Sequence, residues 1–117
     1  MSRVVFRSVT PLLPAGGNLA AAVEYYTQAL GFRVLWHSDT MAGIERDGVR
    51  FNLVENDTVA WVENSSHSIG VSDLEAWYAE LHAVPGRRGP LEMKPWGRRE
   101  FHLVTPSGVC LQFFQQD

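Results

Sequence analysis

The sequence has little of what disulfide-linked, membrane-bound or nucleic-acid-binding proteins require. Cys110 is the only cysteine among 117 residues, so no disulfide can form within the chain. No apolar run approaches the roughly 20 residues that span a bilayer, and the arginine-containing start lacks the apolar core of a secretory signal. The formal charge is −3, whereas nucleic-acid-binding proteins usually carry a basic excess. We therefore expect a cytoplasmic protein that binds neither nucleic acid nor membrane.

Positive charge is also scarce, and it gathers in one stretch near the C-terminal third. The stretch contains Arg87, Arg88, Lys94, Arg98 and Arg99. Glycine and proline interrupt it, and acidic residues at positions 92 and 100 balance it. We interpret this stretch as a solvated loop rather than as a binding surface for an acidic partner.

What the sequence does contain is an internal repeat of amphipathic helices. Residues 18–31 place apolar side chains on one helical face, with Asn18 as the cap and Gly31 as the end. Residues 72–81 repeat the pattern, and Ser72 and Glu75 have the spacing of a capping box. Four apolar positions of the first helix recur 55 residues later in the second: Leu19, Ala22, Val23 and Tyr26 correspond to Leu74, Trp77, Tyr78 and Leu81.

Strand-like runs flank both helices in the same order. An extended segment precedes each helix, at residues 4–13 and 65–71, and three runs follow each one. Asp47-Gly48 indicates a hairpin turn between two of them. The runs that follow the helices are 32–37, 41–46 and 49–55 in the first half, and 91–96, 99–104 and 109–115 in the second. The pattern predicts an α+β protein in which two strand–helix–strand–strand–strand units share one core.

Several local stretches resemble the vicinal-oxygen-chelate superfamily, which includes glyoxalases, dioxygenases and bleomycin-resistance proteins. Asn18-Leu19, residues 22–26 and Leu30-Gly31-Phe32 are similar to the first-helix signature, and residues 71–74 are similar to the entry of the second helix. The run from Pro95 to Phe113 resembles the block Pro-Trp-Gly, Arg-Glu-Phe and Pro-x-Gly of the bleomycin-resistance branch. The resemblance implies one domain over residues 1–117, with βαβββ modules at about 1–60 and 61–117. It further implies curved sheets around a cup, and a homodimer.

Enzymes of this superfamily hold a divalent metal with one side chain from the first and last strand of each module. Carried over to this sequence, those positions fall among residues 8–11 and on Asn52, Ser66 and Gln112. Such donors bind transition metals weakly, so we expect no metal cofactor. The alternative is that His67 coordinates zinc, iron, manganese or nickel through a strand bulge, together with Gln112 and with Glu100 or His102.

Without a metal, the cup would hold a small organic ligand between polar and aromatic side chains. Strand alternation, counted from the resemblance, puts one apolar set of residues against the helices: 51, 53, 69, 71, 101, 103, 111 and 113. The set on the cup face is Arg50, Asn52, Val54, Ser66, Ser68, Gly70, Glu100, His102, Val104, Cys110, Gln112 and Phe114. The residues that we expect to bind the ligand are Asn52, Trp61, Ser66, Trp96, His102, Gln112 and Phe114.

The resemblance then implies a non-catalytic protein that sequesters an aromatic or cationic antibiotic or metabolite, with a role in antibiotic resistance. One alternative is a metal-dependent lyase, isomerase or ring-cleavage dioxygenase in which Glu100 moves a proton. A second alternative is metal-free chemistry with Glu100 and His102 as an acid/base pair.

Overall fold

The repeated pattern of helices and strands is present in the structure, a computed structural model that describes residues 2–117. The first module contains β1 (Leu12–Pro14), α1 (Leu19–Gln28), β2 (Arg33–His37), β3 (Met41–Arg46) and β4 (Val49–Val54). A short helix, α2 (Val59–Asn64), connects it to the second module. That module contains β5 (Ser66–Val71), α3 (Leu74–Glu80), the 3-10 helix η1 (Leu81–Ala83), β6 (Arg87–Arg88), β7 (Glu92–Met93), β8 (Arg99–Val104) and β9 (Cys110–Gln115).

Both predicted helices are present, and local capping sets where they begin. The Asn18 side chain accepts a hydrogen bond from the backbone N of Ala21 at 3.0 Å, as expected for the cap of α1. After α1 the chain turns at Gly31, whose φ of +75° favours glycine. In α3 the cap is Asp73, which accepts from the N of Ala76 at 3.0 Å, so the capping role predicted for Ser72 was wrong by one residue.

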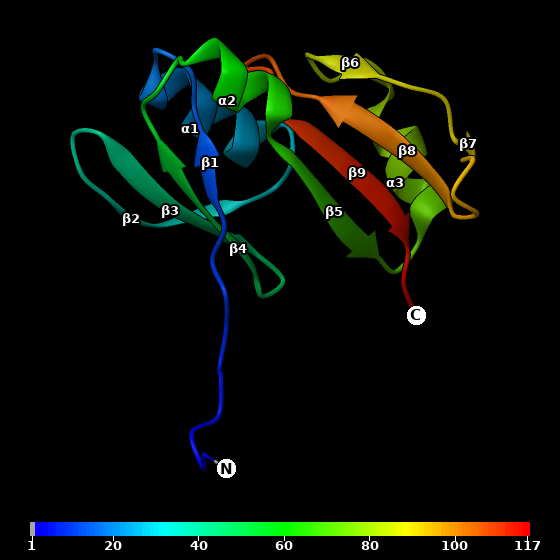
Figure 1. The fold of residues 1–117 in the computed structure, drawn as a ribbon. Helices are drawn as coiled ribbons and strands as arrows, with labels where there is room; N and C mark the ends of the chain where they lie inside the picture. The colour runs from blue at the N-terminus through cyan, green and yellow to red at the C-terminus, as the bar shows by residue number, and fades with distance from the viewer. Residues whose placement is uncertain (1) are drawn as a thin grey trace.

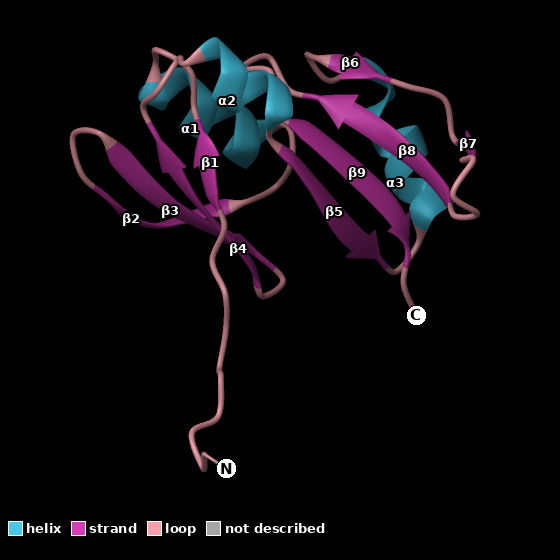
Figure 2. Ribbon diagram, in the orientation of Figure 1, coloured by secondary structure: helices cyan, strands magenta, loops and turns pink. Residues whose placement is uncertain are grey.

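Each module contributes one sheet, and Figures 1 and 2 show the two sheets side by side. The first has the order β1-β4-β3-β2 and the second β5-β9-β8-β6, with β7 paired to β8. The predicted hairpin turn between β3 and β4 is confirmed, because Asp47 and Gly48 both have positive φ. In the second sheet Gln112 is the strand neighbour of Ser68 on one side and of His102 on the other.

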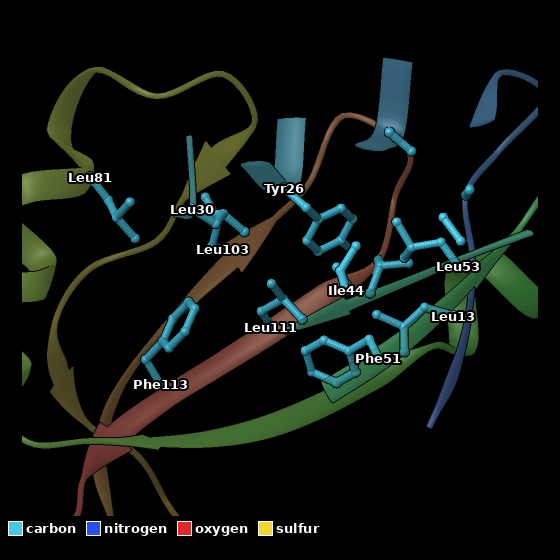
Figure 3. Packing of buried hydrophobic residues seen from close by; sticks show 14 of the residues in the cluster. Leu13, Tyr26, Leu30, Ile44, Phe51, Leu53, Leu81, Leu103, Leu111 and Phe113 are labelled. Atoms are coloured by element: carbon cyan, nitrogen blue, oxygen red, sulfur yellow. The ribbon is translucent and has the colours of Figure 1, made fainter. Parts of the chain in front are cut away.

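The strand alternation expected from the sequence is confirmed by burial. Phe51, Leu53, Phe101, Leu103, Leu111 and Phe113 are all buried, and Ile69 and Val71 pack against them. Figure 3 shows side chains of both sheets converging with Tyr26 of α1 in one cluster. The two modules therefore share a core, and the opposite faces of the sheets are left for polar and half-exposed side chains.

Three sequence predictions differ from the structure. Of the extended segment predicted at 4–13, only residues from Leu12 on join a sheet, and Figure 1 shows residues 2–10 projecting away from the modules. The strand predicted at 91–96 is reduced to the two residues of β7. The helix α2 was not predicted, since its six residues are too few to show helical periodicity.

The interpretation of the basic stretch as a solvated loop holds for exposed Arg87 but was wrong for Arg88. Arg87 and Arg88 form β6, and the guanidinium of Arg88 lies 3.9 Å from the centre of the Tyr78 ring. Arg88 also donates to the carbonyl oxygen of Tyr78 at 2.6 Å. Because an arginine offers five donors and a planar face, Arg88 attaches this part of the chain to α3, whereas Arg87 is exposed. Within residues 2–117, no helix has the length and apolar character needed to cross a membrane.

Candidate functional site

The face of the second sheet that is turned away from the core carries a chain of hydrogen-bonded polar side chains. Gln112 of β9 donates through Nε2 to Ser66 Oγ at 2.8 Å, and its Oε1 accepts from Ser68 Oγ at 3.1 Å. Arg98 Nη2 donates to the same Ser68 oxygen at 3.1 Å. This register brings Ser66 and Gln112, two of the predicted ligand-binding residues, into direct contact on neighbouring strands.

A buried carboxylate lies at the centre of this face. The side chain of Glu100 is 0% exposed, and it accepts hydrogen bonds from Arg98 Nε at 2.7 Å, Trp96 Nε1 at 3.3 Å and His102 Nε2 at 2.7 Å. Burial on its own would raise the pKa of Glu100, but the hydrogen bonds from His102, Arg98 and Trp96 outweigh it and hold the pKa below the ordinary glutamate value. An ionised carboxylate only accepts hydrogen bonds, so the Nε2 of His102 must carry the proton.

Two aromatic surfaces lie beside this carboxylate. The indole of Trp96 stacks on the imidazole of His102, with ring centres 6.2 Å apart and planes 16° from parallel. Trp96 is 60% exposed, so its outer face is open to solvent. Phe114 carries the guanidinium of Arg98 at 4.0 Å from its ring centre. His102, Trp96 and Phe114 are thus brought together as predicted ligand-binding residues on a single sheet face.

Cys110 lies at the end of the same face, and it is half-buried. Burial raises the pKa of its thiol, so the group stays protonated near neutral pH. Cys110 therefore contributes a small, unreactive surface to the site.

The corresponding face of the first sheet holds Asn52, which is half-buried and flanked by Leu12 and Gly43 on the neighbouring strands. The indole of Trp36 lies across Gly43, because glycine leaves the space that a Cβ would otherwise fill. Glu45 binds Arg33 at 2.8 Å and Arg50 at 2.7 Å on the same sheet. Asn52 therefore lies on a second polar and aromatic surface, on a different sheet from Gln112.

Trp61, the remaining predicted ligand-binding residue, is carried by α2 and not by a strand of either sheet. Two residues that the sequence prediction omitted belong to the site. Trp36 could have been found from the glycine at its cross-strand position. Arg98 could not, because its direction depends on the turn at Gly97, which has a φ of +89°.

The donor set does not fit a transition metal. His67 lies beside Leu111 on the core side of the second sheet, where its ring contacts Phe51 at 5.9 Å between centres. Gln112 points to the opposite face, so the alternative pair of metal ligands is not brought together. Among residues 2–117, no three histidine, cysteine, aspartate or glutamate side chains lie close enough to hold an ion together. Burial also lowers the pKa of His67, and its Nε2 lies 3.1 Å from Ser65 Oγ.

The cup expected from the sequence is not an enclosed cavity within one chain. A hollow of about 800 Å³ lies along α1 near Tyr25 and Val84, and another of about 470 Å³ lies near Phe32 and Trp77. Neither hollow is lined by any of the seven residues predicted to bind the ligand. The polar faces of the two sheets reach solvent, since Ser66 and Ser68 are exposed and Asn52 and Gln112 are half-buried.

Comparisons with known proteins agree on one family. The model of the Glyoxalase/Bleomycin resistance protein/Dioxygenase superfamily matches residues 12–113. A bleomycin resistance protein of Geobacillus stearothermophilus is 24% identical, over 91% of this chain and 94% of the relative. The bleomycin-binding protein of bleomycin-producing Streptomyces verticillus, solved with copper(II)-bleomycin, has 25% identity and a TM-score of 0.86, with 97% of this chain and 99% of that chain covered. An antibiotic binding protein from Streptomyces sp. CB03234 has 16% identity and a TM-score of 0.75, over 97% and 100% of the two chains.

Proposed function

Because the chain belongs to the Glyoxalase/Bleomycin resistance protein/Dioxygenase superfamily, we propose that it binds and sequesters an antibiotic of the bleomycin type without using a metal of its own. The observation that carries the proposal is the polar face of the second sheet. It offers amide, hydroxyl and imidazole groups for hydrogen bonds, and an exposed indole for stacking. These groups suit the recognition of a flat heteroaromatic molecule, and they suit metal coordination poorly.

The charges of this face favour a ligand with a cationic part. Glu100 is ionised and lies 3.3 Å from Trp96 Nε1, but its charge is paired with Arg98 at 2.7 Å, so a cationic group gains from the carboxylate by taking the place of Arg98. Cations are attracted to aromatic faces, most strongly to tryptophan. The net charge of −3 adds a weak attraction for the same class of ligand. An aromatic cation therefore gains from both the stacking surface and the carboxylate.

We further propose that the protein works as a homodimer, in which a second copy covers the open faces. Residues 2–10 form an arm whose apolar side chains Val4, Phe6 and Val9 are exposed, and Phe6 is 94% exposed. The edge strand β2 also exposes Val34 and Trp36. Exposed apolar groups in this number indicate a surface that is covered by another protein. A second copy of the chain is a suitable partner, because in a two-fold symmetric dimer the exposed surfaces of both copies are buried against each other.

Isothermal titration calorimetry with metal-free bleomycin tests the proposed function. Protein treated with chelator should bind the drug in a saturable manner at up to one molecule per chain, and the recovered drug should be chemically unchanged. Trp96→Ala should weaken binding by about 2 kcal/mol, or roughly thirtyfold in Kd, because it removes the exposed stacking face. Trp77→Phe is the matched control, since Trp77 packs on Phe113 at the helix side. Absence of binding at micromolar drug would refute the proposal.

One observation favours a second candidate, metal-free proton transfer by His102. Glu100 lies 2.7 Å from the Nε2 of His102 and fixes the orientation of the ring, an arrangement that acid/base catalysis uses. Glu100 itself is fully buried and would position His102 instead of touching a substrate. Mass spectrometry of the drug after prolonged incubation separates the two functions. A product that forms with the native protein and not with His102→Asn would establish catalysis.

A further inference from the structure

The stacking surface of Phe114 is already occupied by a side chain of the protein itself. The guanidinium carbon of Arg98 lies 4.0 Å from the centre of the Phe114 ring, which is the geometry of a planar cation stacked on an aromatic face. Arg98 reaches this place because the chain turns at Gly97, where Lys94 N donates to Arg98 O at 3.0 Å. Another planar group can therefore stack on this face of the Phe114 ring only if Arg98 moves away.

The same guanidinium also occupies one oxygen of the buried carboxylate. Arg98 Nε donates to Glu100 Oε2 at 2.7 Å, and Nη2 donates to Ser68 Oγ at 3.1 Å. Glu100 is completely shielded from solvent, whereas the Arg98 side chain is 38% exposed. Arg98 is thus the outer layer over Glu100 Oε2, and its departure would uncover both a carboxylate oxygen and an aromatic face.

We propose that Arg98 acts as an internal place-holder for a planar cationic group of the ligand, and that ligand binding exchanges one for the other. The inference rests on the proposed function, and it specifies the chemical class that this part of the site selects. A group with an amidinium or guanidinium character supplies N–H donors for Glu100 and a flat cation for Phe114. A neutral aromatic group restores only the stacking. It does not replace the hydrogen bond from Arg98 to the buried carboxylate, and the loss of that bond makes binding less favourable. The exchange therefore selects planar cations over neutral rings of the same shape.

An internal competitor weakens binding in proportion to the fraction of time that it fills the subsite. Removing it should therefore strengthen the binding of a small planar cation. In Arg98→Ala, benzamidinium should bind at least about tenfold more tightly than in the native protein, as measured by thermal shift and NMR titration. Benzamide, its neutral analogue, should gain much less. Arg99→Ala is the matched control, since Arg99 loses the same charge but pairs with Glu75 of α3 at 3.0 Å.

Equal benzamidinium affinity in Arg98→Ala and the native protein would overturn the proposal. Weaker binding in the variant would overturn it as well, because Arg98 would then be part of the surface that receives the ligand. The double variant Arg98→Ala with Glu100→Gln guards against misfolding, since it leaves no unpaired buried charge. It should bind benzamidinium and benzamide about equally, and a retained preference for the cation would contradict the role of Glu100.

The benzamidinium result does not depend on whether bleomycin binds, so the two proposals fail separately. If bleomycin binds but its affinity is the same for the native protein and Arg98→Ala, the place-holder role is wrong and the proposed function stands. If benzamidinium responds as expected and bleomycin does not bind, the subsite is real and the antibiotic is the wrong ligand.

Discussion

Glu100 shows how far a single residue could be interpreted from the sequence. Strand alternation placed it correctly on the face turned away from the core, and its neighbour His102 was correctly assigned to the same face. Its burial was not predictable, because it depends on how the turn before β8 directs Trp96 and Arg98 onto the carboxylate that His102 of β8 also contacts. One alternative drawn from the sequence was a carboxylate that moves a proton on a substrate, whereas the structure has one that accepts three internal hydrogen bonds and organises the residues around it.

The lowered pKa of Glu100 predicts a specific dependence of stability on pH. In the folded protein this carboxylate stays ionised to lower pH than in the unfolded chain, where the pKa of a glutamate is about 4.3. The contribution of Glu100 is therefore complete above about pH 4.3 and is lost as the pH falls toward its lowered pKa. Glu100→Gln should reduce the free energy of unfolding by about 2 kcal/mol at neutral pH, and the difference from the native protein should shrink in acid.

Urea denaturation at a series of pH values measures this difference. Glu92→Gln is the control, because Glu92 is exposed and pairs only with Lys94 at 3.0 Å, a contact expected to matter little. A difference between Glu100→Gln and the native protein that stays constant down to pH 2 would contradict the ionised, hydrogen-bonded carboxylate.

At the scale of elements, the sequence predicted a helix or strand correctly where the apolar pattern repeated over several turns, or where a turn contained residues that favour positive φ. The ten residues of α1 and the Asp47-Gly48 hairpin fall in this class, and both were predicted. The elements that were missed, α2 and β6, have six and two residues and carry no period of their own, and the run predicted at 91–96 is a strand only over the two residues of β7. They exist because surrounding elements hold them, as when Arg88 attaches β6 to Tyr78.

The β2–β3 pair offers a test at this scale, because Trp36 needs the glycine beneath it. A Cβ at position 43 would overlap the indole of Trp36, so Gly43→Ala should lift the ring from the sheet and leave the core side unchanged. We expect a shifted tryptophan emission and weaker binding of bleomycin, with only a small loss of stability. Gly17→Ala, where the nearest atom to the added Cβ is 3.6 Å away, should change neither. Unaltered binding by Gly43→Ala would remove Trp36 from the site.

The whole molecule has one core and two uncovered faces, a division that the repeat in the sequence anticipated. Shared burial of Phe51 and Leu111 unites the modules, whereas Asn52 and Gln112 stand on different sheets. What the sequence could not reveal is that the faces stay open in a single chain. In the proposed dimer a second copy would cover these faces, and no local pattern of residues encodes such an assembly.

The exposed arm makes the assembly testable. Deleting residues 2–9 should convert the proposed dimer to a monomer in light scattering after size exclusion, while circular dichroism stays the same because these residues belong to no helix or strand. Phe6→Asp should have the same effect through one side chain, since Phe6 is the most exposed apolar residue of the arm. Ser2→Asp is the control, as it adds the same charge outside the apolar run. A dimer that survives both changes would show that the arm is not what joins the chains.

The central claim is that the open polar faces of the sheets bind the ligand, and an NMR titration of the chelator-treated protein with metal-free bleomycin tests it most directly. The account predicts that amide resonances of β4, β8 and β9 shift together and saturate, with the largest changes near Asn52, His102 and Gln112. Shifts confined to the helix side, around Tyr25 and Val84, would contradict the account and place the ligand in the hollow along α1 instead.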